Sequence, residues 1–104
     1  GRLREMFKSG GYNVYPREIE QVLEAHPEVA MAAVIGGPDP LYQEVGHAFV
    51  MVKPGASPDP ADLERHCRAR LANYKVPKRF TVGTEFPMLP IGKIDKQALK
   101  ATIR

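Results

Sequence analysis

The apolar positions of this chain recur with a helical period in several segments. Between Pro16 and His26 the apolar side chains share one stripe and glutamates surround it, which predicts a helix that packs by this stripe. After Asp59, a suitable N-cap, and Pro60, a suitable first helical residue, apolar residues recur every fourth position and predict a second helix. A third helix is expected to begin after Asp95.

Two longer apolar runs predict strands. They span Val29 to Ile35 and Val45 to Val52, and the sequence between them, Gly-Gly-Pro-Asp-Pro at 36–40, predicts a rigid loop. The second run is apolar on both of its faces, so we expect that strand to be covered on both sides. The segment from Val76 to Val82 predicts one more short strand.

An N-terminal hairpin is predicted around a pair of glycines. The segments Arg2 to Lys8 and Tyr12 to Tyr15 flank Ser-Gly-Gly at 9–11, and glycine accepts the positive φ angles that a tight turn requires. The elements alternate without repeats, so residues 1–104 are expected to form one domain. The predicted fold class is α+β, a small mixed sheet with this N-terminal β-hairpin and about three helices packed on it.

Charge is distributed unevenly along the chain. The net charge is +3, but residues 65–104 carry ten basic side chains against two acidic ones. This positive region could attract a polyanion such as a nucleotide, CoA or a nucleic acid, and it could equally be a solvated helix face with a basic tail. No apolar run approaches the length of a membrane span and no signal-peptide pattern is present, so we expect a cytoplasmic protein.

The residue types that bind metals or act as nucleophiles form no recognisable motif. Cys67 is the only cysteine, which excludes an internal disulfide, and its place on an apolar helical stripe favours a buried structural thiol over a nucleophile. The histidines at 26, 47 and 66 fall in different predicted elements without partners at metal-ligand spacing. We therefore expect no metal to be held by this domain alone.

One lysine near the C-terminus has a distinctive setting. Lys93 follows a Pro-x-Gly turn in the segment Pro-Met-Leu-Pro-Ile-Gly-Lys-Ile-Asp-Lys at 87–96, and Asp95 can cap the helix that comes next. The ammonium group would point outward on a short tether, where it could meet a phosphate or a carboxylate. From these residues alone, an exposed lysine in a helix-entry loop is at least an equally good interpretation.

Two segments together resemble a known family. The opening Gly-Arg-Leu-Arg-Glu-Met-Phe-Lys-Ser-Gly-Gly-Tyr-Asn-Val-Tyr-Pro-Arg-Glu-Ile-Glu and the later Pro-Ile-Gly-Lys-Ile-Asp-Lys resemble, in order and spacing, the C-terminal domain of AMP-forming acyl-CoA synthetases. The resemblance covers essentially the whole chain and implies a large N-terminal domain that this chain lacks. It also implies a reaction in which a carboxylic acid and ATP give acyl-AMP and pyrophosphate, and the acyl group then passes to the CoA thiol.

The resemblance implies roles for residues at both motifs. Lys93 matches the lysine that reaches the α-phosphate region and the attacking carboxylate during adenylation. Arg2 matches an arginine that bonds to the nucleotide, and Arg4 matches the hinge about which the domain turns between the two half-reactions. The family usually carries aspartate or lysine at the hinge, so arginine departs from the pattern there.

The resemblance also implies a site for CoA. Gly10 and Gly11 match hairpin glycines that line the passage for the pantetheine arm, where the lack of side chains permits close backbone approach. Aromatic and basic groups suit the adenine and phosphates of the CoA nucleotide. Four residues match such positions less closely: Tyr42, Tyr74, Lys75 and Lys78.

The implied cofactors are ATP, with Mg²⁺ held mainly outside this domain, and coenzyme A. The implied partners are the enzyme's own N-terminal domain and a small-molecule carboxylic acid, and the isolated domain is expected to be inactive. Two other classes stay open. An adenylation domain that loads a carrier protein also fits Gly-Lys-Ile-Asp-Lys, whereas a basic nucleic-acid-binding module rests on the charge asymmetry alone. No RNA-recognition or zinc-finger signature is present, so we expect no nucleic-acid partner.

Overall fold

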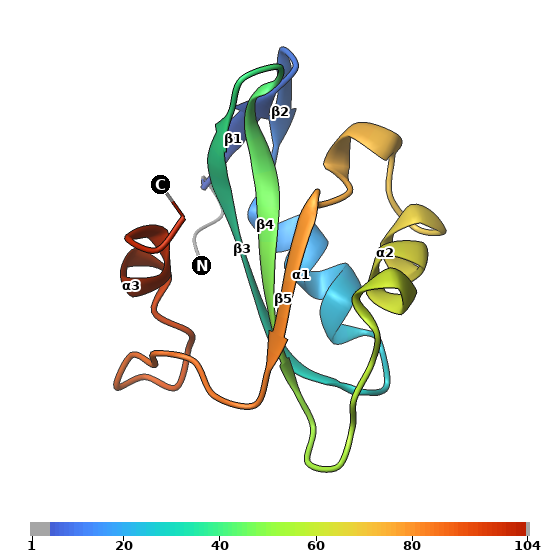
Figure 1. Ribbon diagram of the computed structural model, residues 1–104, viewed down its shortest axis with the longest axis vertical. Helices are drawn as coiled ribbons and strands as arrows, with labels where there is room; N and C mark the ends of the chain where they lie inside the picture. Colours follow the sequence, from blue (N-terminus) through green and yellow to red (C-terminus); the bar gives the residue numbers. More distant parts are fainter. Residues whose placement is uncertain (1–4, 104) are drawn as a thin grey trace.

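The computed structural model describes residues 5–103 and has two α-helices on one face of a mixed β-sheet and a third helix on the other (Figure 1). This arrangement is the α+β fold class that the sequence predicted. The elements in chain order are β1 (Phe7–Ser9), β2 (Tyr12–Val14), α1 (Pro16–Glu24), β3 (Val29–Asp39), β4 (Gln43–Val52), α2 (Pro60–Arg68), the 3-10 turn η1 (Asn73–Lys75), β5 (Arg79–Gly83) and α3 (Lys96–Lys100).

Strand β4 is the centre of the sheet. It pairs antiparallel with β3 along nearly its whole length and parallel with β5, and β1 joins it antiparallel where Ser9 lies opposite Gln43. The N-terminal hairpin places β2 beyond β1, so four strands follow the order β2-β1-β4-β3. Because parallel neighbours need a crossover connection, the chain passes through α2 between β4 and β5, which makes the sheet mixed.

Apolar side chains fill both faces of the sheet. On one face, buried residues of α1 and α2 such as Leu23 and Leu63 pack against Val34 and Val50. On the other face a smaller cluster joins the sheet to α3 and contains Ala33, Ile35, Phe49, Ile94 and Leu99. Neighbouring residues of β4 therefore enter different cores, which confirms that this strand is covered on both sides.

The loop predicted at residues 36–40 was wrong, because β3 continues without a break to Asp39. Gly36 lies opposite Gly46 on β4, and the ring of Phe7 fills the space above them. A Cβ atom at Gly36 would stand 2.7 Å from Cγ of Phe7, so this glycine makes room for an aromatic ring. A glycine pair in a strand can signal close packing as well as a turn.

The helix starts follow the predictions. Pro16 is in the first turn of α1, and the carboxylate of Asp59 accepts a hydrogen bond from the backbone N–H of Ala61 at 3.2 Å at the start of α2.

The strand predicted from Val76 begins instead at Arg79, because Pro77 has no N–H to donate to the sheet. Part of the strand predicted at residues 2–8 lies outside the described residues, and β1 begins at Phe7.

Cys67 is fully buried in the core between α2 and the sheet, and burial raises the pKa of its thiol to about 11. We expect a thiol-specific reagent at about pH 8 to leave the folded chain unmodified, because the thiolate is both scarce and inaccessible. The same reagent in denaturant should label one thiol per chain. Measuring both in parallel is the check, and rapid labelling of the folded chain would contradict the burial.

Candidate functional site

Lys93 directly follows a three-residue hairpin turn formed by residues 90–92. The backbone N–H of Gly92 donates to the carbonyl of Leu89 at 2.9 Å, and the N–H of Leu89 donates to the carbonyl of Lys93 at 2.7 Å. Gly92 has a φ of 86°, as expected for a type I turn followed by a residue in the left-handed region, and Pro90 suits the first turn position. We call residues 89–93 the Lys93 loop. Its backbone is fixed by its own hydrogen bonds.

The base of the Lys93 loop is anchored to the domain. Ile94 is buried beside Leu99 in the α3 core, an apolar contact across the start of the helix, and Met88 lies opposite Ile94 in a β-bridge. Asp95 caps α3 by accepting a hydrogen bond from the N–H of Ala98 at 3.2 Å. The loop therefore has a rigid base and an exposed tip.

At the tip, Lys93 is exposed beside apolar side chains that are also uncovered. Ile91 has 75% of its surface exposed, and Leu89 is exposed as well. Within residues 5–103, no carboxylate lies at ion-pair distance from the Lys93 ammonium group. An uncompensated cation among exposed apolar groups is suited to meeting an anion held on another surface.

The second set of predicted residues gathers around the N-terminal hairpin. Gly10 and Gly11 form its turn with φ angles of 57° and 87°, as predicted. The N–H of Gly10 donates to the carbonyl of Tyr42 at 2.8 Å, which ties the hairpin to the β3–β4 turn. Tyr12, which the sequence did not single out, stacks on Tyr74 with 4.5 Å between ring centroids.

Two lysines complete this surface. The ammonium group of Lys78 lies 5.6 Å from the ring centroid of Tyr42, and that of Lys75 lies 5.7 Å from the centroid of Tyr74. The ammonium group of Lys75 also donates a hydrogen bond to Glu18 at 3.1 Å, and this hydrogen bond is the main cause that raises the pKa of Lys75. We call the surface formed by Gly10, Gly11, Tyr42, Tyr74, Lys75 and Lys78 the hairpin face.

The two candidate sites lie at different ends of the molecule. In Figure 1 the β1–β2 hairpin is at the top of the sheet, whereas the chain between β5 and α3, which includes the Lys93 loop, is at the lower left. The structure thus brings together the predicted residues of the hairpin face and keeps Lys93 apart from them. Arg2 and Arg4 lie outside the described residues, and the description begins at Glu5.

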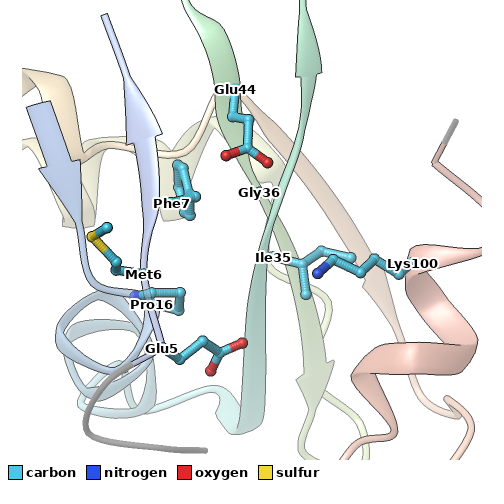
Figure 2. Close-up of a pocket in the computed structure, with 8 residues that line it drawn as sticks. All are labelled: Glu5, Met6, Phe7, Pro16, Ile35, Gly36, Glu44 and Lys100. Carbon is cyan, nitrogen blue, oxygen red and sulfur yellow. The ribbon is translucent and has the colours of Figure 1, made fainter. Parts of the chain in front are cut away.

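A small hollow lies between β1, the start of α1 and β3 (Figure 2). Phe7 packs against Gly36 at its wall, and the charged side chains around it are Glu5, Glu44 and Lys100. Within residues 5–103, no group of three or more histidine, cysteine or carboxylate side chains is placed to bind a metal ion. No helix of this described part is long and apolar enough to cross a membrane.

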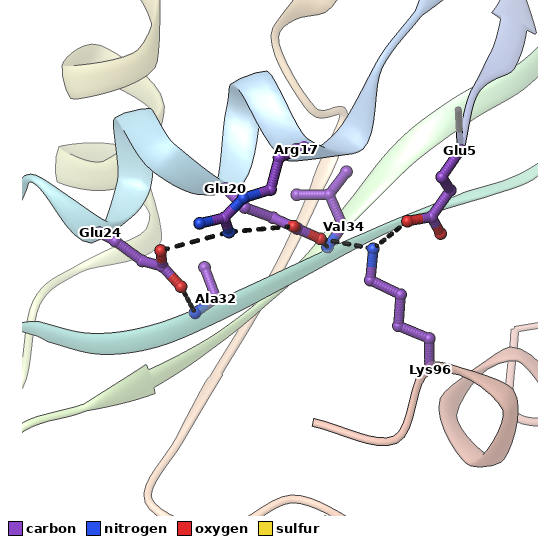
Figure 3. A network of polar contacts seen from close by, with 7 residues as sticks. All are labelled: Glu5, Arg17, Glu20, Glu24, Ala32, Val34 and Lys96. Carbon is purple, nitrogen blue, oxygen red and sulfur yellow. Dashed lines mark hydrogen bonds and ion pairs between the residues drawn. The ribbon is translucent and has the colours of Figure 1, made fainter. Parts of the chain in front are cut away.

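Sequence reasoning missed a buried polar network between α1, β3 and the start of α3 (Figure 3). Glu20 on α1 is 2% exposed and accepts a hydrogen bond from the N–H of Val34 at 2.9 Å. Lys96, the first residue of α3, pairs with Glu20 at 2.6 Å and with Glu5 at 2.7 Å. Along the chain Glu20 directly follows Ile19, which lies on the apolar stripe of the helix. This position beside the stripe was the only sign in the sequence that Glu20 is buried.

The comparisons with known proteins all indicate the same family. Residues 18–93 match the family described as AMP-binding enzyme C-terminal domain. The 2-succinylbenzoate–CoA ligase of Geobacillus kaustophilus (strain HTA426) is 45% identical over 102 residues, which cover 98% of this chain and 21% of that protein. The fatty acid–[acyl-carrier-protein] ligase ScoC of Streptomyces coeruleorubidus is 43% identical over 99 residues, which cover 95% of this chain and 19% of that protein.

Among solved structures, apo MatB from Rhodopseudomonas palustris superposes with a TM-score of 0.89 at 36% identity, covering 98% of this chain and 20% of that one. The fold is that of a small domain, and both candidate sites lie on its surface. The chain belongs to the family of AMP-binding enzyme C-terminal domains, and its resemblance to those of AMP-forming acyl-CoA synthetases is confirmed. It spans about a fifth of the length of the relatives it matches.

Proposed function

We propose that this chain is the mobile C-terminal domain of an ATP-dependent carboxylic acid:CoA ligase. The observation that supports it most is the separation of two candidate sites, the Lys93 loop and the hairpin face, which lie at different ends of the molecule. A domain that turns between two orientations could present each site in its own half-reaction. The large N-terminal domain would be its partner and would hold the carboxylic acid and most of the Mg²⁺ coordination.

In the first orientation, Lys93 would serve adenylation. The carboxylate and the α-phosphate are both anions, and negative charge grows at phosphorus as they react. A fixed cation at that point lowers the barrier because it is already oriented and needs no reorganisation. The hydrogen-bonded Lys93 loop and its exposed tip supply the fixed base and the reach that this role requires. Arg2 would bind the nucleotide of ATP, and Arg4 would be the hinge.

In the second orientation, the hairpin face would serve thioester formation. Gly10 and Gly11 would line the pantetheine passage, since backbone without side chains permits close approach. The ring of Tyr42 and the face of Tyr74 that Tyr12 leaves uncovered would offer stacking surfaces for adenine, and the lysines beside them would offer charge for the phosphates of CoA. A cytoplasmic location fits this cofactor, and the isolated domain would be inactive.

A carrier-protein thiol is the second candidate acceptor, because one relative is by name a fatty acid–[acyl-carrier-protein] ligase. The test uses the full polypeptide that carries this domain, first in acid-dependent exchange of labelled pyrophosphate into ATP over a panel of carboxylic acids. The acid that supports exchange is then offered CoA and a phosphopantetheinyl carrier protein in competition. We expect exchange with at least one acid and preferential thioester formation on CoA. Preference for the carrier protein would favour the second candidate, and no exchange with any acid would contradict both.

A further inference from the structure

The most deeply buried charge in the described residues belongs to Glu20, whose side chain is 3% exposed. An ionised carboxylate in such a place needs partners, because burial removes its hydration. One partner is the N–H of Val34, a backbone group that faces outward from β3, the last strand on that side of the sheet. The other close partner is the ammonium group of Lys96 at 2.6 Å, whereas Arg17 is more distant at 3.6 Å.

Lys96 makes a second ion pair that reaches a different part of the chain. Its ammonium group lies 2.7 Å from Glu5, and its own side chain is 19% exposed, so the cation stands between two carboxylates in a largely enclosed place (Figure 3). Glu5 directly follows Arg4, the proposed hinge. Lys96 therefore joins helix α1, the start of α3 and the segment by which the chain enters the domain.

Lys96 is also only three residues from Lys93, with Ile94 and Asp95 between them. Ile94 holds residues next to the Lys93 loop by apolar burial, and Asp95 fixes the helix start, but within residues 5–103 neither makes a hydrogen bond or ion pair with α1 or Glu5. Charge-assisted hydrogen bonds are more directional than apolar contacts. We propose that Lys96 is a positioning residue, which sets the Lys93 loop relative to the domain junction through its ion pairs with Glu20 and Glu5.

This inference rests on the proposed function for its effect on catalysis, but its structural part can be tested separately. In the full polypeptide, Lys96→Met is expected to speed hydrogen exchange of peptides that cover residues 87–95, because this segment loses the ion pair that connects it to α1. Lys53→Met is the matched control, since Lys53 is exposed at the end of β4 and belongs to neither candidate site. Unchanged exchange in the Lys96 variant would overturn the proposal.

A kinetic experiment tests whether Lys96 acts through Lys93. Lys96→Met should lower kcat of acid-dependent pyrophosphate exchange by about 10- to 100-fold, because a displaced catalytic group loses most of its effect. It should leave thioester formation from supplied acyl-AMP unchanged, and Lys96→Arg should restore most of the exchange. In a Lys93→Ala background, Lys96→Met should have little further effect. If Lys96→Met lowers pyrophosphate exchange by the same factor in the Lys93→Ala background, the role of Lys96 is merely structural. The same conclusion follows if Lys96→Met lowers both half-reactions equally.

One outcome separates this proposal from the proposed function, and one further variant covers a failure to fold. If Lys93→Ala alone leaves pyrophosphate exchange intact, the adenylation role of Lys93 is wrong, while faster hydrogen exchange in the Lys96 variant still supports the positioning of the loop. If Lys96→Met prevents folding, the double variant Lys96→Met with Glu20→Gln replaces it. Glutamine removes the uncompensated buried charge and keeps an oxygen that can accept the N–H of Val34.

Discussion

Replacing Lys93 with alanine is expected to lower acid-dependent ATP–pyrophosphate exchange by about 10² to 10³, equivalent to about 3–4 kcal/mol of transition-state stabilisation. The effect should fall on kcat, because the cation is needed most where negative charge develops during the reaction. The measurement is exchange of labelled pyrophosphate into ATP by the full polypeptide, with saturating acid. Thioester formation from supplied acyl-AMP should change by less than about twofold.

In this structure, Lys93→Ala removes a charge with little effect on packing. The Lys93 loop is closed by backbone hydrogen bonds at Leu89 and Gly92, and the Lys93 side chain is exposed, so truncation removes a charge without removing a packed group. Lys53→Ala is the matched control, because Lys53 is also exposed and belongs to neither candidate site. If exchange is unchanged in the Lys93 variant, Lys93 is a surface lysine and the family membership explains the fold alone.

The elements that the sequence predicted well are those whose signals are local. Asp59 and Asp95 do cap the helices that follow them, and the Gly10-Gly11 turn has the two positive φ angles that such a turn requires. The loop predicted at Gly36 was wrong because the reason for a glycine at this position is not local in the sequence. The glycine makes room for Phe7, which is distant in sequence, and no pattern around residue 36 contains that information.

The same distinction applies to the candidate sites. The motif around Lys93 can be found from its neighbours along the chain, whereas Lys96 acquires its role from Glu5 and Glu20, which are far away in sequence. The hairpin face is also a product of folding, since Tyr42 comes from the β3–β4 turn and Tyr74 from η1. The resemblance named these tyrosines individually, and the structure brings both of them to the hairpin.

Substituting phenylalanine at Gly11 is expected to lower thioester formation from supplied acyl-AMP by at least about 10²-fold, while pyrophosphate exchange changes by less than about threefold. The side chain would stand in the proposed pantetheine passage and obstruct only the orientation that uses the hairpin face. Both half-reactions are measured on the same preparation of the full polypeptide. Equal loss of both would indicate a folding defect instead.

The structure supplies an unusually close control for Gly11, because the substitution has two effects that must be separated. Gly11 has a φ of 87°, and a Cβ atom at this residue would have no heavy atom within 4 Å apart from those of its two chain neighbours, so a side chain there meets backbone strain but no clash within the domain. Gly55 in the β4–α2 loop has a φ of 80° and is equally open. Gly55→Phe therefore carries the same strain, about 1–2 kcal/mol, at a place remote from both sites. If it lowers thioester formation as much as Gly11→Phe does, the strain is responsible and the hairpin glycines line no passage.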